Sequence, residues 1–309
     1  MRSSSSTDML RRLTGVVTLG VVLAGCAGTD APTEPDGTTT STSASPTAGS
    51  ASPKPARHSG TAGLDRDLVA DLEAVAAAHP DSEVSVALAP VGGKSRPRVV
   101  GDAEELVAWS TIKVPVSLAV LDSGQSHPQD IESALTVSDN EAAERLWMSL
   151  GESPDAARSV ERELRRGGDH NTRVPGEVTS PGHSVPGQTV WRLSDQTAFT
   201  SSLPCRSGSA TVTDAMGRVV EGQRWGLGQI RDVRFKGGWG DTPDGYVVRQ
   251  LGVLPGATGA KGETAATLQV RTGTHEQGTA IADELAGVLE DHAEDLPTGS
   301  CSGSRVRPS

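Results

Sequence analysis

The fold of this chain is decided by one stretch, Trp109-Ser110-Thr111-Ile112-Lys113-Val114-Pro115, which leads into an apolar helix predicted over 114–121. Ser110 and Lys113 are three residues apart, so they lie on the same face of a helix. The lysine amine is then within reach of the serine hydroxyl, at a helix end where backbone N–H groups favour negative charge. Because a serine becomes a nucleophile only when a nearby base takes its proton, this pair predicts nucleophilic catalysis. Taken alone, Ser-x-x-Lys also fits many ordinary helix starts.

Two further short motifs follow in the chain, Ser138-Asp139-Asn140 and Lys236-Gly237-Gly238. Each has an ordinary interpretation: Ser138 and Glu141 fit a capping box, and Lys-Gly-Gly fits a strand that runs into a turn. In this order, the three motifs resemble the signature of the serine β-lactamases and penicillin-binding proteins, Ser-x-x-Lys, Ser-Asp-Asn and Lys-Thr-Gly. More narrowly, the chain resembles the class A-related serine-hydrolase lipoproteins of actinobacteria over nearly all of residues 61–294.

The resemblance implies a role for each matching residue. Ser110 would be the nucleophile that accepts the acyl group, and Lys113 would accept its proton. Ser138 would relay a proton to the leaving group, and Asn140 would hold the substrate amide. Lys236 would supply positive potential for Ser138 and for a substrate carboxylate. Repulsion between the two lysines is expected to favour a neutral amine on Lys113.

The resemblance also implies a substrate strand and an oxyanion hole. Gly238 and Trp239 would contact the substrate, and the backbone N–H groups of Ser110 and Trp239 would bind the oxyanion. A tetrahedral oxyanion needs two fixed donors, and the loss of one typically costs about 3 kcal/mol of transition-state stabilisation.

Several departures from the family pattern bear on turnover. Gly237 stands where the family has Thr or Ser, so the hydroxyl expected to bind a substrate carboxylate is missing. Arg249 is a candidate replacement, although a surface ion pair is the alternative. Glu177 is the candidate for the glutamate that activates the deacylating water, and its alternative is a solvated loop residue. His170 and His183 have no companions at ligand spacing, so we expect no metal and no cofactor.

Hydrophobic periodicity predicts an α+β domain whose sheet is assembled from both ends of the domain. The predicted strands are 83–89, 98–101, 231–236, 246–254 and 265–271, and the predicted helices are 64–79, 114–121, 131–137, 141–150, 153–166, 188–202, 210–220 and 276–292. The resemblance implies the β-lactamase/DD-peptidase-like arrangement, an antiparallel five-stranded sheet flanked by the terminal helices. Only 28 positions separate Ser110 from Ser138, so the all-helical subdomain should be reduced. The segment 167–187 is a long Gly- and Pro-rich loop, which predicts either a function or disorder.

The first 60 residues predict export rather than a folded domain. Three arginines precede an apolar run over 13–24, which is too short to span a bilayer and has the layout of a secretory signal. Leu23-Ala24-Gly25-Cys26 resembles the bacterial lipoprotein box, with an ordinary cleavage site as the alternative. We therefore expect a signal peptide over 1–25, a lipidated Cys26 with a Thr/Ser/Pro tether over 26–60, the domain over 61–294 and a tail over 295–309.

Charge and cysteine content fit an exported protein. The formal net charge of −11 would become −13 after cleavage, and no basic patch appears, so nucleic acid is excluded as a partner. If Cys26 is lipidated, Cys205 and Cys301 remain as a pair, for which we predict a disulfide; two unpaired thiols are the alternative. The expected location is the outer side of the cell membrane, where the chain would be a lipid-anchored monomer.

The sequence thus supports an acyl-serine hydrolase that attacks an amide or ester of the β-lactam or D-alanyl peptide class, with slow turnover. Its substrate would be a small molecule or derive from peptidoglycan. Gly237 and the reduced helices leave a second hypothesis open, a non-hydrolytic cell-envelope binding module that keeps the same fold. A solute-binding lipoprotein is a third, poorer hypothesis, because it leaves the three motifs unexplained.

Overall fold

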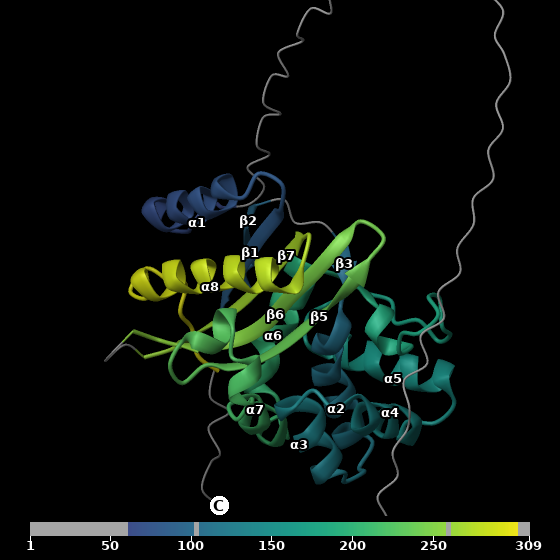
Figure 1. Cartoon of the computed structure of the whole chain (residues 1–309). Helices are drawn as coiled ribbons and strands as arrows, with labels where there is room; N and C mark the ends of the chain where they lie inside the picture. The colour runs from purple at the N-terminus through teal and green to yellow at the C-terminus, as the bar shows by residue number, and fades with distance from the viewer. Residues whose placement is uncertain (1–60, 102–104, 258–260, 302–309) are drawn as a thin grey trace, which may run out of the picture. The chain divides into compact units, whose positions relative to one another are not determined.

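The computed structural model describes residues 61–101, 105–257 and 261–301. The predicted signal peptide, Cys26, the tether and residues 302–309 of the predicted tail lie outside the described residues. Five strands form one antiparallel sheet in the order β2-β1-β7-β6-β5 (Figure 1). The strands are β1 (Glu83–Pro90), β2 (Arg98–Gly101), β5 (Arg234–Thr242), β6 (Gly245–Pro255) and β7 (Glu263–Thr272). The predicted sheet is therefore confirmed.

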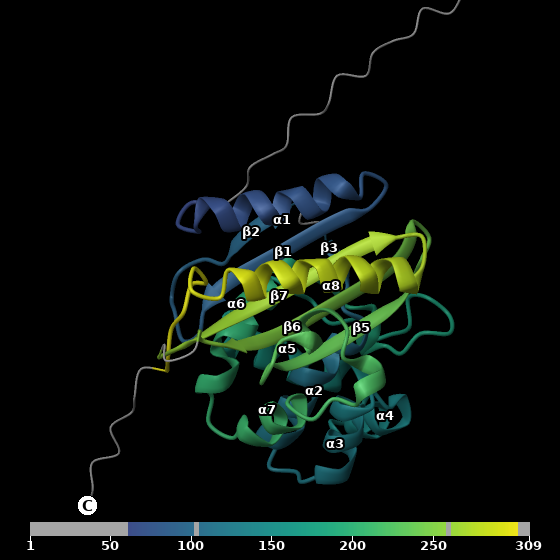
Figure 2. The same ribbon diagram turned by 60° about the vertical axis from the view of Figure 1, so that its left-hand side comes forward.

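Two terminal helices cover one face of this sheet, α1 (Arg66–Ala78) and α8 (His275–Asp291), and they lie side by side (Figure 2). Asp65 caps α1 by accepting hydrogen bonds from the backbone N–H groups of Asp67 and Leu68. The apolar faces of both helices pack on the sheet and form one of the main cores. This layer matches the amphipathic helices expected at 64–79 and 276–292.

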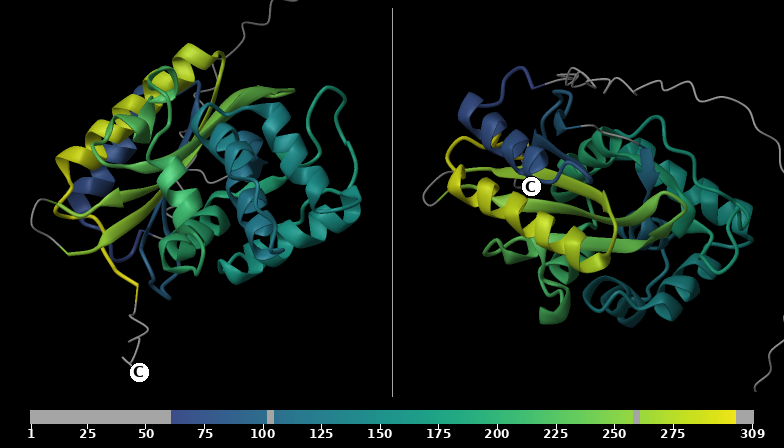
Figure 3. Two further views of the ribbon diagram at one scale, coloured as in Figure 1. Left: turned by 90° about the horizontal axis from the view of Figure 1, so that it is seen from below. Right: turned by 45° about the horizontal axis from the view of Figure 1, so that its top comes forward.

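The other face of the sheet carries the remaining helices (Figure 3, left). Here α6 (Leu193–Ser202) packs on β1, β6 and β7. The others are α2 (Lys113–Asp122), α3 (Pro128–Thr136), α4 (Asn140–Ser149), α5 (Ser153–Arg166) and α7 (Ala210–Met216). The first eight residues of α2 are all buried, which explains why its sequence is apolar on every side. The helix that carries Lys113 is thus the centre of the second core.

Two elements differ from the prediction. The helix expected from 188 begins only at Leu193, because Val190–Arg192 (β4) pairs with a short strand, Glu105–Val107 (β3), that the sequence did not predict. The strand expected over 231–236 is shifted to Arg234–Thr242 and runs on through Gly237, Gly238 and Gly240. Glycine is a weak strand former by itself, but here the pairing with β6 continues past all three.

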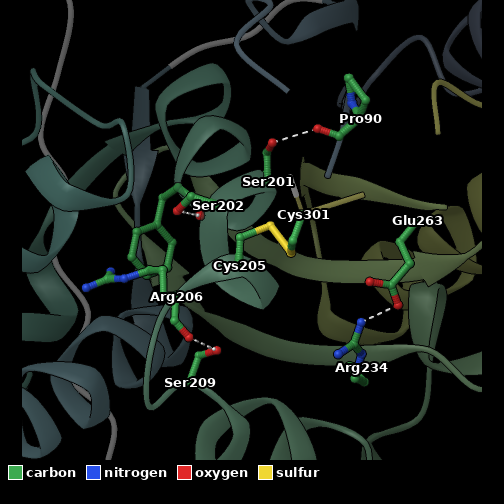
Figure 4. The surroundings of a disulfide bond; sticks show 10 residues. Pro90, Ser201, Ser202, Cys205, Arg206, Ser209, Arg234, Glu263 and Cys301 are labelled. Atoms are coloured by element: carbon green, nitrogen blue, oxygen red, sulfur yellow. Dashed lines mark hydrogen bonds and ion pairs between the residues drawn. A yellow bond between two sulfur atoms is a disulfide. The ribbon is translucent and has the colours of Figure 1, made fainter. Parts of the chain in front are cut away.

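The predicted disulfide between Cys205 and Cys301 is confirmed (Figure 4), with a Cα–Cα distance of 5.1 Å. It joins the chain just after α6 to the C-terminal segment. That segment is held further by two backbone hydrogen bonds between Glu263 and Gly299, of 2.7 and 3.0 Å. The part of the predicted tail that the structure describes is therefore bound to the domain.

The loop between α5 and Pro186 is fixed by side-chain hydrogen bonds. Asp169 is fully buried, accepts from the backbone N–H groups of Asn171 and Thr172, and accepts from the indole N–H of Trp191 at 2.9 Å. Further along the loop, the side-chain oxygen of Gln188 accepts hydrogen bonds from the backbone N–H and the hydroxyl of Thr179. Among the described helices, none has the length and apolar character that a membrane span requires.

Candidate active site

Ser110 lies in a short 3₁₀ helix, Trp109–Ile112, that runs directly into α2. Trp109 has a φ of 48°, a left-handed conformation that costs a non-glycine residue roughly 1–2 kcal/mol. Strain of this kind collects at functional sites, where the surrounding structure enforces it. Ser110 is half-buried, and its hydroxyl has no hydrogen-bond partner within the described residues. The strained turn therefore presents a free hydroxyl.

Strand β5 passes directly under this turn. A Cβ atom on Gly238 would lie 2.8 Å from the backbone N of Ser110 and 3.0 Å from that of Thr111. A Cβ atom on Gly240 would lie 2.8 Å from the Trp109 ring. Only glycine allows the strand to come this close. The next residue, Trp239, whose backbone N–H was expected to help form the oxyanion hole, lines the same cavity as Ser110.

Lys113 and Lys236 meet at the hydroxyl of Ser138. The Nζ atom of Lys113 lies 3.3 Å from Ser138 Oγ, and that of Lys236 lies 2.9 Å from it. Lys113 also donates to the backbone carbonyl of Ser138 and to Asn140 Oδ1, both at 2.7 Å. The tertiary structure thus brings together four residues from the three motifs. They are Lys113, Ser138, Asn140 and Lys236, which were all predicted to belong to one site.

The three residues of the second motif have three different tasks. Ser138 adopts a φ of 59°, which directs its carbonyl and hydroxyl toward the lysines. Asp139 caps α4 by accepting hydrogen bonds from the backbone N–H groups of Glu141 and Ala142. The capping-box interpretation, with Ser138 as the cap, is therefore wrong. Asn140 is the first residue of α4 and binds the lysine.

Burial disfavours positive charge on both amines. Lys113 is 6% exposed, and its desolvation lowers the pKa to about 8, although the nearby Asp139 carboxylate raises it. Lys236 is 1% exposed; its desolvation, with the adjacent charge of Lys113, holds its pKa well below the ordinary lysine range. Lys113 can therefore lose its proton near neutral pH. The main cause is burial, whereas the sequence suggested repulsion between the lysines.

The cavity above Ser110 has a volume of about 450 Å³. Ser110, Lys113, Asn140 and Trp239, four of the predicted site residues, are among those that form its wall. Its other lining residues are Trp109, Ile112, Val116, Ala143, Glu144, Gly182, His183, Ser184, Pro186, Gly187, Gly240 and Asp241. Sequence reasoning missed Glu144, although a signal was present, because it follows Asn140 by four residues and so shares its helix face.

Two predicted site residues have other positions. Glu177 is exposed and does not line the cavity, so its expected role as deacylation base is wrong for this structure. Arg249 is fully buried and donates to the carbonyls of Leu106, Val107 and Trp191 and to Gln196. Because it has no exposed surface, neither a substrate carboxylate nor a surface ion pair is its partner.

The missing hydroxyl at Gly237 has a packing cause. A Cβ atom there would lie 3.2 Å from the ring of Trp225, closer than side chains normally pack. Trp225 in turn makes edge-to-face contacts with Trp239 and His275 on the α8 side of the sheet. A larger residue at 237 would press on this aromatic cluster.

One group of the described residues has donor atoms close enough to hold a metal ion. Ligand atoms of Asp65, His292 and Asp295 lie within 4.8 Å of one another. His292 is already paired with Asp71 and Asp295, at 2.8 and 3.3 Å. The group lies at the ends of α1 and α8, and neither helix contributes to the cavity above Ser110.

No family model matches this chain, and no curated protein matches it in sequence. Solved structures do match. A β-lactamase from Xanthomonas campestris pv. campestris is 16% identical, with a TM-score of 0.55 over 73% of this chain and 97% of the other. A variant of the class A β-lactamase of the last common ancestor of Gram-negative bacteria is 17% identical, with a TM-score of 0.57 over 75% of this chain and 100% of the other.

A mutant of PBP-A, in an acyl-enzyme complex with penicillin G, is 16% identical, with a TM-score of 0.58 over 74% of this chain and 97% of the other. At these identities the likeness shows the fold. The fold is that of the serine β-lactamases and penicillin-binding proteins, as the order of the three motifs predicted.

Proposed function

From the fold of the serine β-lactamases and penicillin-binding proteins, we propose that this chain is an acyl-serine enzyme with Ser110 as its nucleophile. The observation that carries the proposal is the meeting of Lys113 and Lys236 at Ser138, beside a cavity that contains Ser110. A lysine with a pKa of about 8 can act as a base near neutral pH. The substrate is an amide or ester, of which β-lactams and D-alanyl peptides are examples.

Acylation proceeds through attack on the substrate carbonyl and loss of the leaving group. Ser110 Oγ forms a bond to the substrate carbonyl carbon while its proton passes to the neutral amine of Lys113. The backbone N–H groups of Ser110 and Trp239 stabilise the oxyanion. The C–N or C–O bond then breaks, and the leaving nitrogen or oxygen takes a proton through the hydroxyl of Ser138. Lys113 and Lys236 hold that hydroxyl in place.

Deacylation is slow in this proposal. Because Glu177 is exposed and outside the cavity, the acyl-enzyme lacks the carboxylate that was expected to activate water. A Glu177→Gln variant should therefore keep the acyl-enzyme lifetime of the native protein. The chain would act as a slow hydrolase, or would transfer its acyl group to another acceptor.

The place of action is part of the same proposal. A signal peptide over 1–25 and a lipid on Cys26 would hold the domain on the outer side of the cell membrane, at the end of the tether. Metabolic labelling with a fatty acid tests this directly. Label that is lost in a Cys26→Ala variant supports the anchor, and unlabelled native protein rules it out.

A second candidate function is binding without chemistry, and one observation favours it. Lys113 points to Ser138 and Asn140, and Ser110 makes no hydrogen bond to it in this structure. Catalytic hydrogen bonds often tighten only when substrate is bound, so an acyl-serine enzyme would bring Lys113 to Ser110 in its substrate complex.

The deciding experiment incubates the purified full-length chain and its Ser110→Ala variant with a fluorescent penicillin. A mutant of PBP-A, which shares the fold, has been solved as an acyl-enzyme complex with penicillin G, so a penicillin is a reasonable first probe. A covalent band that disappears in the variant supports the acyl-serine enzyme. If neither the penicillin nor a panel of activated esters labels Ser110, the binding function is favoured.

A further inference from the structure

Glu144 lines the cavity while remaining exposed to solvent, and the acylation mechanism does not use its carboxylate. It lies on α4, one turn beyond Asn140, and Ala143 beside it also lines the cavity. Since residues four apart on a helix share a face, the face that presents Asn140 to Lys113 also presents Glu144 to the cavity.

No positive side chain neutralises Glu144 within the described part of the chain. Lys113, the buried amine of the same cavity, binds Ser138 and Asn140 instead. The neighbouring Arg145 pairs with Asp130 at 2.7 Å. The cavity therefore contains a carboxylate whose charge is available to a ligand.

The same site offers little to a negatively charged ligand. Arg249 is sealed beneath β3 and β4, and Gly237 has no hydroxyl. Lys236 is buried, and its amine is engaged by Ser138 and by the carbonyl of Gly237 at 2.7 Å. Neither the hydroxyl that the family has at position 237 nor its candidate replacement, the Arg249 guanidinium, is thus available to a substrate carboxylate in the described site.

An aromatic wall completes the site. The rings of Trp109 and His183 meet edge to face, with centroids 5.0 Å apart, and both residues line the cavity. The indole N–H of Trp109 is buried and has no acceptor within the described residues. A cavity lined by both an indole ring and a carboxylate is a favourable environment for an organic cation.

We propose that Glu144 selects acyl donors that carry a positively charged amine in the acyl group. The inference rests on the proposed acyl-serine function, because it concerns the substrate of that reaction. Asn140 is expected to hold the amide of the acyl group. Glu144 is one helical turn away, about 5–6 Å, so the amine lies within a few bonds of that amide.

Three penicillins that differ at one position test this proposal. At a pH of about 6, where an α-amine is protonated, ampicillin carries an ammonium group on the carbon next to the side-chain amide, penicillin G carries hydrogen there, and carbenicillin carries a carboxylate. Second-order acylation rates of the full-length chain, measured by intact-protein mass spectrometry, should fall in that order. Each step should be roughly three- to tenfold, as expected of one partly solvated ion pair with an aromatic contact.

The variant Glu144→Gln should bring the three rates together without abolishing acylation. The matched control is Glu141→Gln, which removes the same charge from an exposed position of the same helix outside the cavity. It should keep the order. Equal rates in the native protein, or an order that survives Glu144→Gln, overturns the proposal. A longer acyl-enzyme lifetime in Glu144→Gln for all three, with the order unchanged, assigns Glu144 to water activation and also overturns it.

A binding measurement separates this proposal from the acylation chemistry. The Ser110→Ala variant is titrated with phenylglycinamide, which is cationic, and with phenylacetamide, which is neutral, and tryptophan fluorescence is recorded. Tighter binding of the cation, by roughly threefold or more, that Glu144→Gln removes supports the amine site even if no penicillin labels Ser110. Equal affinities refute it, even if acylation is observed.

Discussion

The Nζ atom of Lys236 lies 2.9 Å from the Oγ atom of Ser138, although 98 residues separate them in the chain. Lys236 stands within β5, where its amine is fully enclosed, and Ser138 occupies a left-handed turn before α4. Lys113 reaches the same hydroxyl from α2. Packing of β5 and α4 around α2 thus brings both amines to the Ser138 hydroxyl, as the proton path of the proposed acylation requires.

Replacing Lys236 by Met should lower the acylation rate by about 10²-fold, because Ser138 loses the donor that fixes its hydroxyl. The melting temperature should hold or rise, since the variant no longer buries an amine. Labelling by a fluorescent penicillin over time measures the rate. The control is Lys261→Met, at an exposed position, which should label like the native protein. A near-native rate for Lys236→Met would contradict the proton path.

The acylation rate should rise with pH and reach half its maximum near pH 8. Lys113 accepts the serine proton only when its amine is neutral, and burial lowers its pKa to about 8. Below that pH the amine is protonated and the rate falls about tenfold per pH unit; above it the rate levels off. Rates of labelling between pH 6 and 10 give the profile. A flat profile, or one that rises only near the ordinary lysine range around pH 10.5, excludes Lys113 as the base.

Gly238→Ala should abolish acylation and lower the free energy of unfolding. Its Cβ atom would lie 2.8 Å from the backbone N of Ser110, so either the strand or the nucleophile turn must shift. A cost of about 1–3 kcal/mol is expected from such overpacking.

The matched control for Gly238→Ala is Gly287→Ala, on the exposed side of α8, where nothing lies within 4 Å of the new methyl group. This change should stabilise the domain by about 0.5–1 kcal/mol, because alanine is the better helix former. Urea denaturation and penicillin labelling of both variants make the comparison. Native-like labelling of Gly238→Ala would show that the close approach is not needed.

Arg249→Leu should destabilise the domain by about 3 kcal/mol. The guanidinium group satisfies three buried carbonyl oxygens and the Gln196 side chain, and leucine leaves them without a donor. Burial lowers the pKa of Arg249 to about 9, so the guanidinium stays charged at pH 7 and its hydrogen bonds are charge-assisted. Arg231→Leu, at a position whose side chain is 86% exposed, should change stability by less than about 0.5 kcal/mol. If urea denaturation gives Arg249→Leu the same free energy of unfolding as the native protein, the structural role of Arg249 is contradicted.

Loss of the disulfide should lower the free energy of unfolding by about 2–4 kcal/mol, because the bond closes a loop across 96 positions of sequence. The Cys205→Ser/Cys301→Ser variant should still label with penicillin at 25 °C, since neither residue lines the cavity. Denaturation of the variant and of the native chain, with and without a reductant, measures the effect. An equal effect of the reductant on both proteins would argue that the bond does not form.

Patterns that are local in sequence predicted most of the elements. The amphipathic helices at both ends and four of the five sheet strands lie near the positions expected from periodicity. Both failures come from strand pairing, in one place with a segment far along the chain and in the other with the strand that follows directly. Val190–Arg192 looks helical until β3 is placed beside it, and the glycines of β5 look like a turn until β6 pairs with them. In both places the partner strand overrides the local propensity.

The sequence by itself predicted the fold and the candidate site residues, because three short motifs in a fixed order indicate both. Only the tertiary structure decided the surroundings of each polar group. It buried Arg249 under two short strands, left Glu177 exposed outside the cavity, and placed the exposed Glu144 among the residues that line the cavity. Those outcomes depend on which segments pack together across long separations. No spacing within a single motif encodes such packing, since the burial of a side chain is set by neighbours from elsewhere in the chain.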